Sequence, residues 1–264
     1  MKYGMPTLVE CKDITECVAL ANRLGLDFVE INMSFPQYQT ENLDASYIRK
    51  LGEDNRVFYT IHADEQMNPF DFNKKVSDCY FEIMRGYINF AKSLSIPVIN
   101  MHLLKGVYVT LPGKVILLSD VYIDDYISRV REFISMCESE IGDYPLKIAI
   151  ENVDANPFTK SQVKALEYFM SSPVFALTLD IGHDKCMNGA DRYIFEKYPE
   201  KLVHLHLHDS DGKSAHLPLG VGKVDTGATI SMLNNGDTCL IEVKTISGLE
   251  QSVVYIKNMD LHKD

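Results

Sequence analysis

The sequence lacks the paired cysteines that stabilise small secreted proteins. Its 6 cysteines are scattered along 264 residues, none forms a Cys-x-x-Cys pair, and none has a histidine at zinc-finger spacing. We therefore expect free thiols in a reducing compartment. A chain of this length buries roughly three quarters of its unfolded surface, which excludes a mini-protein that depends on disulfides.

Long apolar runs and linker segments are also absent. No stretch approaches the roughly 18 consecutive apolar residues that a membrane helix needs, and the first residues, MKYGMPTLVECKD, contain no apolar run of signal-peptide length. We therefore expect a cytoplasmic protein without a membrane partner. Because no Pro/Gly/Ser-rich linker divides the chain, we expect residues 1–264 to form a single domain.

Positive charge is scarce. The chain has 26 Lys and Arg residues against 37 Asp and Glu residues, which gives a formal net charge of −11. Affinity for nucleic acid depends on Lys and Arg that neutralise phosphates, so a nucleic acid is a poor candidate for the main partner. The fractions of hydrophobic residues (46%) and charged residues (24%) are those of an ordinary globular protein, which excludes a collagen-like fibre and a disordered chain.

Short apolar runs recur along the whole chain. Each is rich in Val, Ile, Leu, Thr or aromatic residues, as β-strands are. Longer amphipathic stretches with helical spacing separate them. The eight expected strands are residues 2–8, 27–32, 57–63, 97–103, 146–152, 175–181, 202–208 and 238–244.

The first expected helix begins after an Asp13 N-cap and ends near Gly25. The other expected helices lie near 42–52, 76–91, 122–137, 160–170, 190–198, 226–233 and 248–258. Eight strands that alternate with eight helices indicate parallel strands and right-handed crossovers. The sequence therefore predicts an α/β fold, a (β/α)8 TIM barrel, with an open doubly wound sheet as the alternative.

Polar residues lie near the C-terminal ends of six expected strands and share one parity. Side chains alternate between the barrel interior and the helix layer, so residues of this parity face the interior. Active sites of such barrels lie at the C-terminal ends of the strands. Buried carboxylates without positive charge would destabilise the barrel, and metal ions supply that charge. These residues are His62, His102, Glu151, Asp180, His204, His206, His208 and Glu242.

Four of these residues, Glu151, Asp180, His206 and Glu242, form a set of three oxygen donors and one nitrogen donor. The set suits Mn²⁺, Co²⁺, Mg²⁺ or Zn²⁺ and is too rich in carboxylates for a structural zinc site. The ion would bind two sugar oxygens and acidify a carbon-bound proton beside a carbonyl. Glu151 and Glu242 would transfer that proton as general base and acid.

The remaining histidines offer a second and a third ion site. His62 and His102, sharing Glu151, form a second site, and paired metal sites of this kind favour hydrolysis of phosphate esters. His183 and His216 would hold a third ion or bind substrate oxygens. We therefore expect one to two ions, with a third in doubt.

Six segments in this order resemble the xylose-isomerase-like TIM barrels. That superfamily contains sugar and sugar-phosphate isomerases and epimerases, and also the endonuclease IV class of abasic-site nucleases. The resemblance covers nearly the whole chain. The segments are IHADEQMN (61–68), NMHLL (100–104), IAIENV (148–153), LDIGHD (179–184), HLHDSDGKSAHLPLGVG (206–222) and LIEV (240–243).

The resemblance implies roles for individual residues. The four-donor set matches the metal ligands common to both branches, and His62 and His102 match the first zinc site of the nucleases. His183 matches a residue that binds substrate in epimerases and a third zinc in nucleases, and His216 matches another third-zinc ligand. The nuclease pattern has Asp where this chain has Ser214, a poorer ligand, and Asp211 would need a different loop path to replace it.

Outside the histidines and acids, loop residues are further candidates. His208 and Asp209 are expected to orient His206 or to reach the substrate, and Asn152 to orient Glu151. Lys105, Lys213 and Lys223 follow strand ends and are candidates for a phosphate contact. The loop at 105–120 is predicted either as a lid over the pocket or as a β-hairpin on the barrel rim.

The favoured hypothesis is a metal-dependent isomerase or epimerase of a small sugar or sugar phosphate. The second hypothesis is a zinc-dependent abasic-site endonuclease of the endonuclease IV kind. Ser214 and the net charge argue against it, as does the segment MSFPQYQTEN (33–42), which has no Lys or Arg to hold a phosphate backbone. A barrel that only binds a ligand and a lyase or dehydratase are further alternatives. The sequence leaves the sugar, the metal and the oligomeric state open, and a homo-oligomer is compatible with it.

Overall fold

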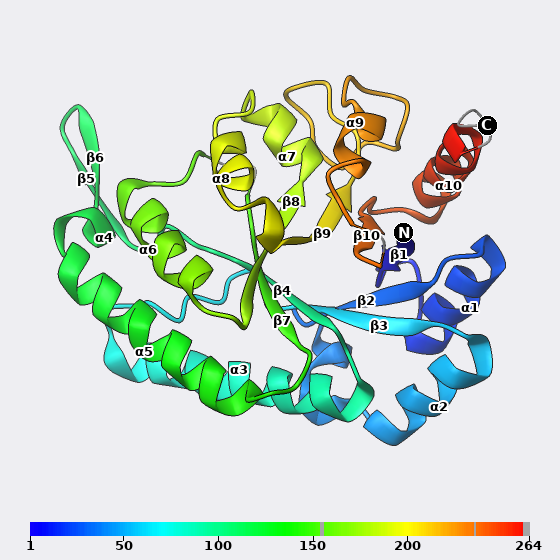
Figure 1. Cartoon of the computed structure of the whole chain (residues 1–264), viewed down its shortest axis with the longest axis horizontal. Helices are drawn as coiled ribbons and strands as arrows, with labels where there is room; N and C mark the ends of the chain where they lie inside the picture. Colours follow the sequence, from blue (N-terminus) through cyan, green and yellow to red (C-terminus); the bar gives the residue numbers. More distant parts are fainter. Residues whose placement is uncertain (154–155, 235, 261–264) are drawn as a thin grey trace.

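The computed structural model describes residues 1–153, 156–234 and 236–260. Eight parallel strands close into a barrel in the order β1-β10-β9-β8-β7-β4-β3-β2 (Figure 1). All eight lie within the predicted strand ranges, which confirms the (β/α)8 barrel and rules out the open sheet. The strands are β1 (Lys2–Pro6), β2 (Phe28–Asn32), β3 (Phe58–His62), β4 (Val98–His102), β7 (Lys147–Glu151), β8 (Phe175–Asp180), β9 (Leu202–Leu207) and β10 (Thr238–Ile241).

Helices surround the barrel and bury their apolar faces against it. The first begins and ends where the sequence predicts, because Asp13 accepts hydrogen bonds from two backbone N–H groups and Gly25 adopts a left-handed φ of 74°. The helices that follow the expected strands are α1 (Ile14–Leu24), α2 (Ala45–Asn55), α3 (Lys74–Leu94), α5 (Ile123–Ile141), α6 (Lys160–Ser171), α8 (Arg192–Lys197), α9 (Thr226–Ile230) and α10 (Ile246–Asp260).

Several short elements were not predicted. The helix α7 (Ile181–Cys186) begins directly after the last residue of β8, and α4 (Leu118–Val121) precedes α5. Both are too short to show a helical period in the sequence. The described residues also form 3-10 turns at Pro36–Tyr38, Thr40–Asn42 and Pro199–Lys201.

The parity predicted for the strands is the one observed. Ile99, Ile148 and Leu177 point outward into the main hydrophobic core. Val98, Ala149 and Ala176 form a separate buried cluster, which fills the N-terminal end of the barrel interior. The polar residues of the same parity therefore face the interior at the opposite, C-terminal end.

Residues 105–120 contain a β-hairpin, which is one of the two structures predicted for this loop. Strands β5 (Tyr108–Leu111) and β6 (Lys114–Leu117) pair antiparallel, and the Leu118 N–H donates to the Val107 carbonyl at the base. Figure 1 shows the hairpin projecting away from the barrel beside α4. Apolar side chains remain exposed on it, including Tyr108 and Val115. No helix within the described residues is long and apolar enough to cross a membrane.

Candidate metal centre at the barrel mouth

Four adjacent strands bring Glu151, Asp180, His206 and Glu242 to one point. The Nδ1 atom of His206 lies 3.2 Å from Glu151 Oε1, 3.2 Å from Glu242 Oε2 and 3.9 Å from Asp180 Oδ2. One donor atom of each residue lies within 4.8 Å of the others. The parallel register explains this convergence, because Asp180 pairs with His206 at the ends of β8 and β9.

The buried donor atoms of this group fit a divalent ion. Glu151 Oε1, Glu242 Oε2 and His206 Nδ1 are buried and have no hydrogen-bond partner. Buried polar atoms normally find one. Three unpaired donor atoms that face a common point, with carboxylate and imidazole chemistry, match the coordination of Mn²⁺, Co²⁺, Mg²⁺ or Zn²⁺.

Charge within the group is strongly coupled. Burial disfavours the ionised forms, yet the attraction between His206 and its carboxylate neighbours outweighs that penalty. It lowers the pKa of Glu151 and of Glu242 well below the usual range and raises the pKa of His206 well above its own. A proton on His206 thus balances the carboxylates when no ion is bound, and an ion would take its place.

His62 and His102 adjoin the same centre from β3 and β4. Their Nε2 atoms each lie 3.4 Å from Glu151 Oε2, so the two rings face one carboxylate oxygen. Asn100 donates its side-chain N–H to this oxygen as well. The residues predicted for a second ion site therefore lie together, with Asn100 as a neighbour that was not predicted.

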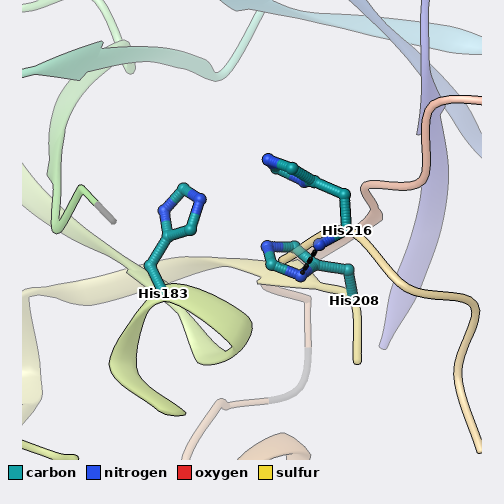
Figure 2. A group of neighbouring side chains, drawn as sticks. All are labelled: His183, His208 and His216. Atoms are coloured by element: carbon teal, nitrogen blue, oxygen red, sulfur yellow. Dashed lines mark hydrogen bonds between the residues drawn. The ribbon is translucent and has the colours of Figure 1, made fainter. Parts of the chain in front are cut away.

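Three histidines stand beside the metal centre, on α7 and on the loop after β9 (Figure 2). The His216 backbone N–H donates to His208 Nδ1 at 2.8 Å, so this nitrogen offers a lone pair and the proton lies on Nε2. His208 Nε2 lies 2.9 Å from Asp180 Oδ2, to which it donates. With both nitrogens engaged, His208 orients a carboxylate of the metal centre.

His183 and His216 keep ring nitrogens toward the cavity. His183 Nδ1 lies 3.1 Å from the Asn152 carbonyl, and its buried Nε2 has no partner. Burial lowers the pKa of His216 to about 4, so this ring is neutral at pH 7. The Asn152 side chain donates to the Asp180 carbonyl and accepts the Asp180 N–H. Asn152 therefore aligns the end of β8, whereas it was expected to orient Glu151.

The loop after β9 is organised by Asp209. Its carboxylate accepts the backbone N–H groups of Ser210, Gly220, Gly222 and Val224 at 2.8–3.0 Å. Asp209 therefore neither orients His206 nor faces the substrate. Ser214 and Asp211 are engaged in a turn of the same loop, where Asp211 Oδ1 accepts the N–H of Ser214, so Asp211 does not replace the missing nuclease ligand.

A further carboxylate lies deeper in the barrel. Glu30, on β2, accepts the Thr60 hydroxyl at 2.8 Å, and its oxygens lie 3.3 Å from His204 Nε2 and 3.4 Å from His206 Nε2. All of these groups are buried. Glu30 thus faces the nitrogen of His206 that points away from the metal centre. The interior parity of β2 would have revealed it.

Two adjoining cavities open above the centre. The first, of about 320 Å³, includes His62, His102, Glu151, His183 and Glu242 in its lining, and also His216 and Lys244. The second, of about 210 Å³, shares His62, Glu65, Glu242 and Lys244 with it. Among the described residues, Lys244 is the lysine at these cavities, whereas Lys105, Lys213 and Lys223 line neither.

The fold and this group of residues define a class, the (β/α)8 barrels whose strand ends gather carboxylates and histidines at one mouth. Within that class, the family model of the xylose isomerase-like TIM barrel matches residues 18–259, and the chain belongs to this family.

Known proteins similar to this chain include sugar epimerases. L-ribulose-5-phosphate 3-epimerase UlaE of Shigella flexneri serotype 5b (strain 8401) is 25% identical over 263 residues, covering 93% of this chain and 87% of that protein. The structure of a D-tagatose 3-epimerase-like protein has a TM-score of 0.77 at 22% identity and covers 98% of this chain and 96% of that one. The IolI protein, with a binding zinc atom, has a TM-score of 0.69 at 15% identity, with coverage of 99% and 97%.

Proposed function

We propose that the protein is a metal-dependent epimerase or isomerase of a ketose, with Glu151 and Glu242 as the proton-transferring groups. The observation that carries this proposal is the convergence of two buried carboxylates with unpaired oxygens beneath one cavity. The epimerase relatives support the reaction class. When bound, a divalent ion would polarise the substrate carbonyl and acidify the neighbouring C–H group.

The surrounding side chains prepare the two carboxylates for different tasks. Asn100, His62 and His102 all face Glu151 Oε2, whereas Oε1 faces His206. Lys244 Nζ lies 2.7 Å from Glu242 Oε1, whereas Oε2 faces His206. Such unequal surroundings separate the proton affinities of two acids, as a base and an acid in one reaction require.

Two histidines suit the hydroxyl groups of a sugar. His183 Nδ1 faces the Asn152 carbonyl, which leaves its unpartnered Nε2 to meet a hydroxyl group. His216 lines the same cavity, and its lowered pKa of about 4 leaves it uncharged at pH 7. Together they would hold a ketose so that its reacting carbon lies between Glu151 and Glu242.

Solvent isotope exchange tests this proposal. The protein loaded with Mn²⁺, incubated with a panel of ketoses in deuterated water, should form an epimer or aldose that carries deuterium at the reacting carbon. The variant Glu242→Gln should lose roughly 100-fold or more of this exchange, because an amide cannot accept the proton. The matched surface variant Glu196→Gln should exchange at the wild-type rate, since Glu196 is exposed on α8.

Full exchange by Glu242→Gln would exclude the assigned role of Glu242.

The second candidate function is zinc-dependent cleavage of DNA at abasic sites, favoured by the group of His62, His102 and Glu151. Against it stands the loop geometry that leaves Ser214 and Asp211 outside the centre. Zinc-dependent nicking of abasic DNA by the purified protein, without any ketose exchange, would make the nuclease the better conclusion.

A further inference from the structure

We infer that the site takes an uncharged ketose and rejects the phosphate ester of the same sugar. This inference rests on the proposed function and narrows its substrate class. It follows from the charge of the cavity lining and from the hydrogen bonds of the two loops in which TIM barrels usually hold a phosphate.

The lining of the two mouth cavities is negatively charged. Its described residues include four carboxylates, Glu30, Glu65, Glu151 and Glu242, against the single ammonium group of Lys244. A phosphate dianion would therefore meet repulsion in a partly desolvated site, whereas a neutral polyol would not.

The ammonium group of this lining is already paired. Lys244 Nζ binds Glu242 Oε1 at 2.7 Å, and the attraction of that carboxylate raises the pKa of Lys244 although burial opposes it. Moving the ammonium group to a phosphate would leave Glu242 without its partner. Lys185 and Lys223 line a different cavity, which shares no lining residue with the two at the mouth.

Several backbone donors of the loop after the seventh barrel strand are already engaged. TIM barrels commonly bind phosphate through the loops after strands seven and eight and through a helix N-terminus. Here the seventh strand is β9, and the N–H groups of Gly220, Gly222 and Val224 in its loop donate to Asp209. An internal carboxylate thus occupies the position where a phosphate would accept these bonds.

The N-terminus of the helix after the eighth strand also faces a carboxylate of the chain. The Ile246 N–H at the start of α10 donates to the carboxylate of Glu10, which comes from the loop after β1. The Gly248 N–H donates to the Thr245 hydroxyl at 3.2 Å. The positive end of the helix dipole therefore faces a carboxylate of the chain itself, and an incoming phosphate would have to displace it.

The second cavity offers amide and hydroxyl groups beside its carboxylates. Asn32 donates to Glu65 Oε1 at 3.0 Å, Ser34 Oγ accepts the Glu65 N–H at 3.0 Å, and Thr7 lies in the same lining. Amide, hydroxyl and carboxylate groups in one small cavity suit the far hydroxyl groups of a sugar. The end of the substrate that carries the phosphate in a sugar phosphate would therefore meet side chains that bind hydroxyl groups.

Matched substrate pairs test this inference. Protein loaded with Mn²⁺ is given D-fructose or D-fructose 6-phosphate, and D-ribulose or D-ribulose 5-phosphate, and deuterium exchange and calorimetric binding are both measured. The free sugar should exceed its ester by about 100-fold in kcat/KM and by about tenfold in affinity. Equal or better binding of the esters would overturn the inference. The absence of deuterium exchange with every sugar would contradict the proposed function alone, because the binding comparison would still test the inference.

A charge variant tests the electrostatic cause. Glu65→Gln removes one negative charge from the lining at nearly constant shape, so the preference for the free sugar should fall by about tenfold in affinity. Glu53→Gln, on the exposed face of α2, removes the same charge far from the cavities and should leave the preference unchanged. An unchanged preference in Glu65→Gln, or an equal change in both variants, would overturn the electrostatic argument.

Discussion

Asp209 holds the loop after β9 through four hydrogen bonds from backbone N–H groups, two to each carboxylate oxygen. The approach is so close that a Cβ atom at Gly222 would lie 2.4 Å from Asp209 Oδ1. This loop carries His216 into the cavity and adjoins His208. The position of one buried carboxylate therefore sets the position of a cavity wall.

Replacing Asp209 with asparagine tests this role. The amide NH₂ would face two backbone donors, so Asp209→Asn should lower the free energy of unfolding by about 2–4 kcal/mol, measured by urea denaturation. Asp211→Asn is the matched control, because Asp211 is exposed in the same loop, and it should cost less than about 1 kcal/mol. Equal losses in the two variants would contradict the assigned role.

Strand parity predicts which residues face the barrel interior but not how their side chains pair. It brought Glu151, Asp180, His206 and Glu242 together in the sequence analysis, and the structure places them at one point. The partners Asn100 and Lys244 were missed, since their contacts depend on side-chain rotamers. His208 Nε2 donates to Asp180 because the His216 N–H fixes the tautomer of the His208 ring. The spacing of residues in the sequence does not predict that tautomer.

At the scale of elements, prediction succeeded where the apolar period was long. The helices α1, α3 and α5 have clear amphipathic faces and were found close to their observed bounds. The short helix α7 was missed because its six residues include Gly182, His183 and Asp184, which show no apolar period. Its glycine is needed for close packing, as a Cβ there would lie 2.0 Å from the His208 ring.

The hairpin β5–β6 can be removed at a defined point. The Leu118 N–H donates to the Val107 carbonyl, so replacing residues 108–117 with Asn-Gly would close a two-residue turn there. Because no described residue of the hairpin lines either mouth cavity, we expect kcat/KM for the ketose to stay within about twofold. A loss as large as that of Glu242→Gln, measured in the same isotope-exchange assay, would instead assign the hairpin the role of a lid.

At the scale of the molecule, eight alternating strand and helix signals sufficed to predict the barrel, because few topologies satisfy short right-handed connections. The site could be located for the same reason, since the strand ends of a barrel meet at one mouth. The substrate could not be predicted in this way, because it depends on cavity charge and on loops such as the one Asp209 holds. The single domain, the cytoplasmic location and the oligomeric state stay predictions.

Ion binding should stabilise the whole molecule, since the centre gathers buried carboxylates. At 100 times its Kd, Mn²⁺ should add about 2.7 kcal/mol, which raises the unfolding temperature of a chain of this size by roughly 5–10 °C. Thermal unfolding of chelator-treated protein with and without added Mn²⁺ measures this shift. Asp180→Asn should lose most of it and the exposed Asp54→Asn should keep it, whereas no shift in the wild-type protein would contradict the metal centre.

The closure of the barrel joins the two ends of the chain, with Lys2 paired to Thr238 and Gly4 paired to Leu240. Because β1 is the first strand of the barrel and β10 the last, the barrel has two unpaired edges until these two strands pair. Open strand edges are templates for aggregation. Glu242 follows the closing strand directly, so the donor groups of Glu151, Asp180, His206 and Glu242 come together only when the barrel closes.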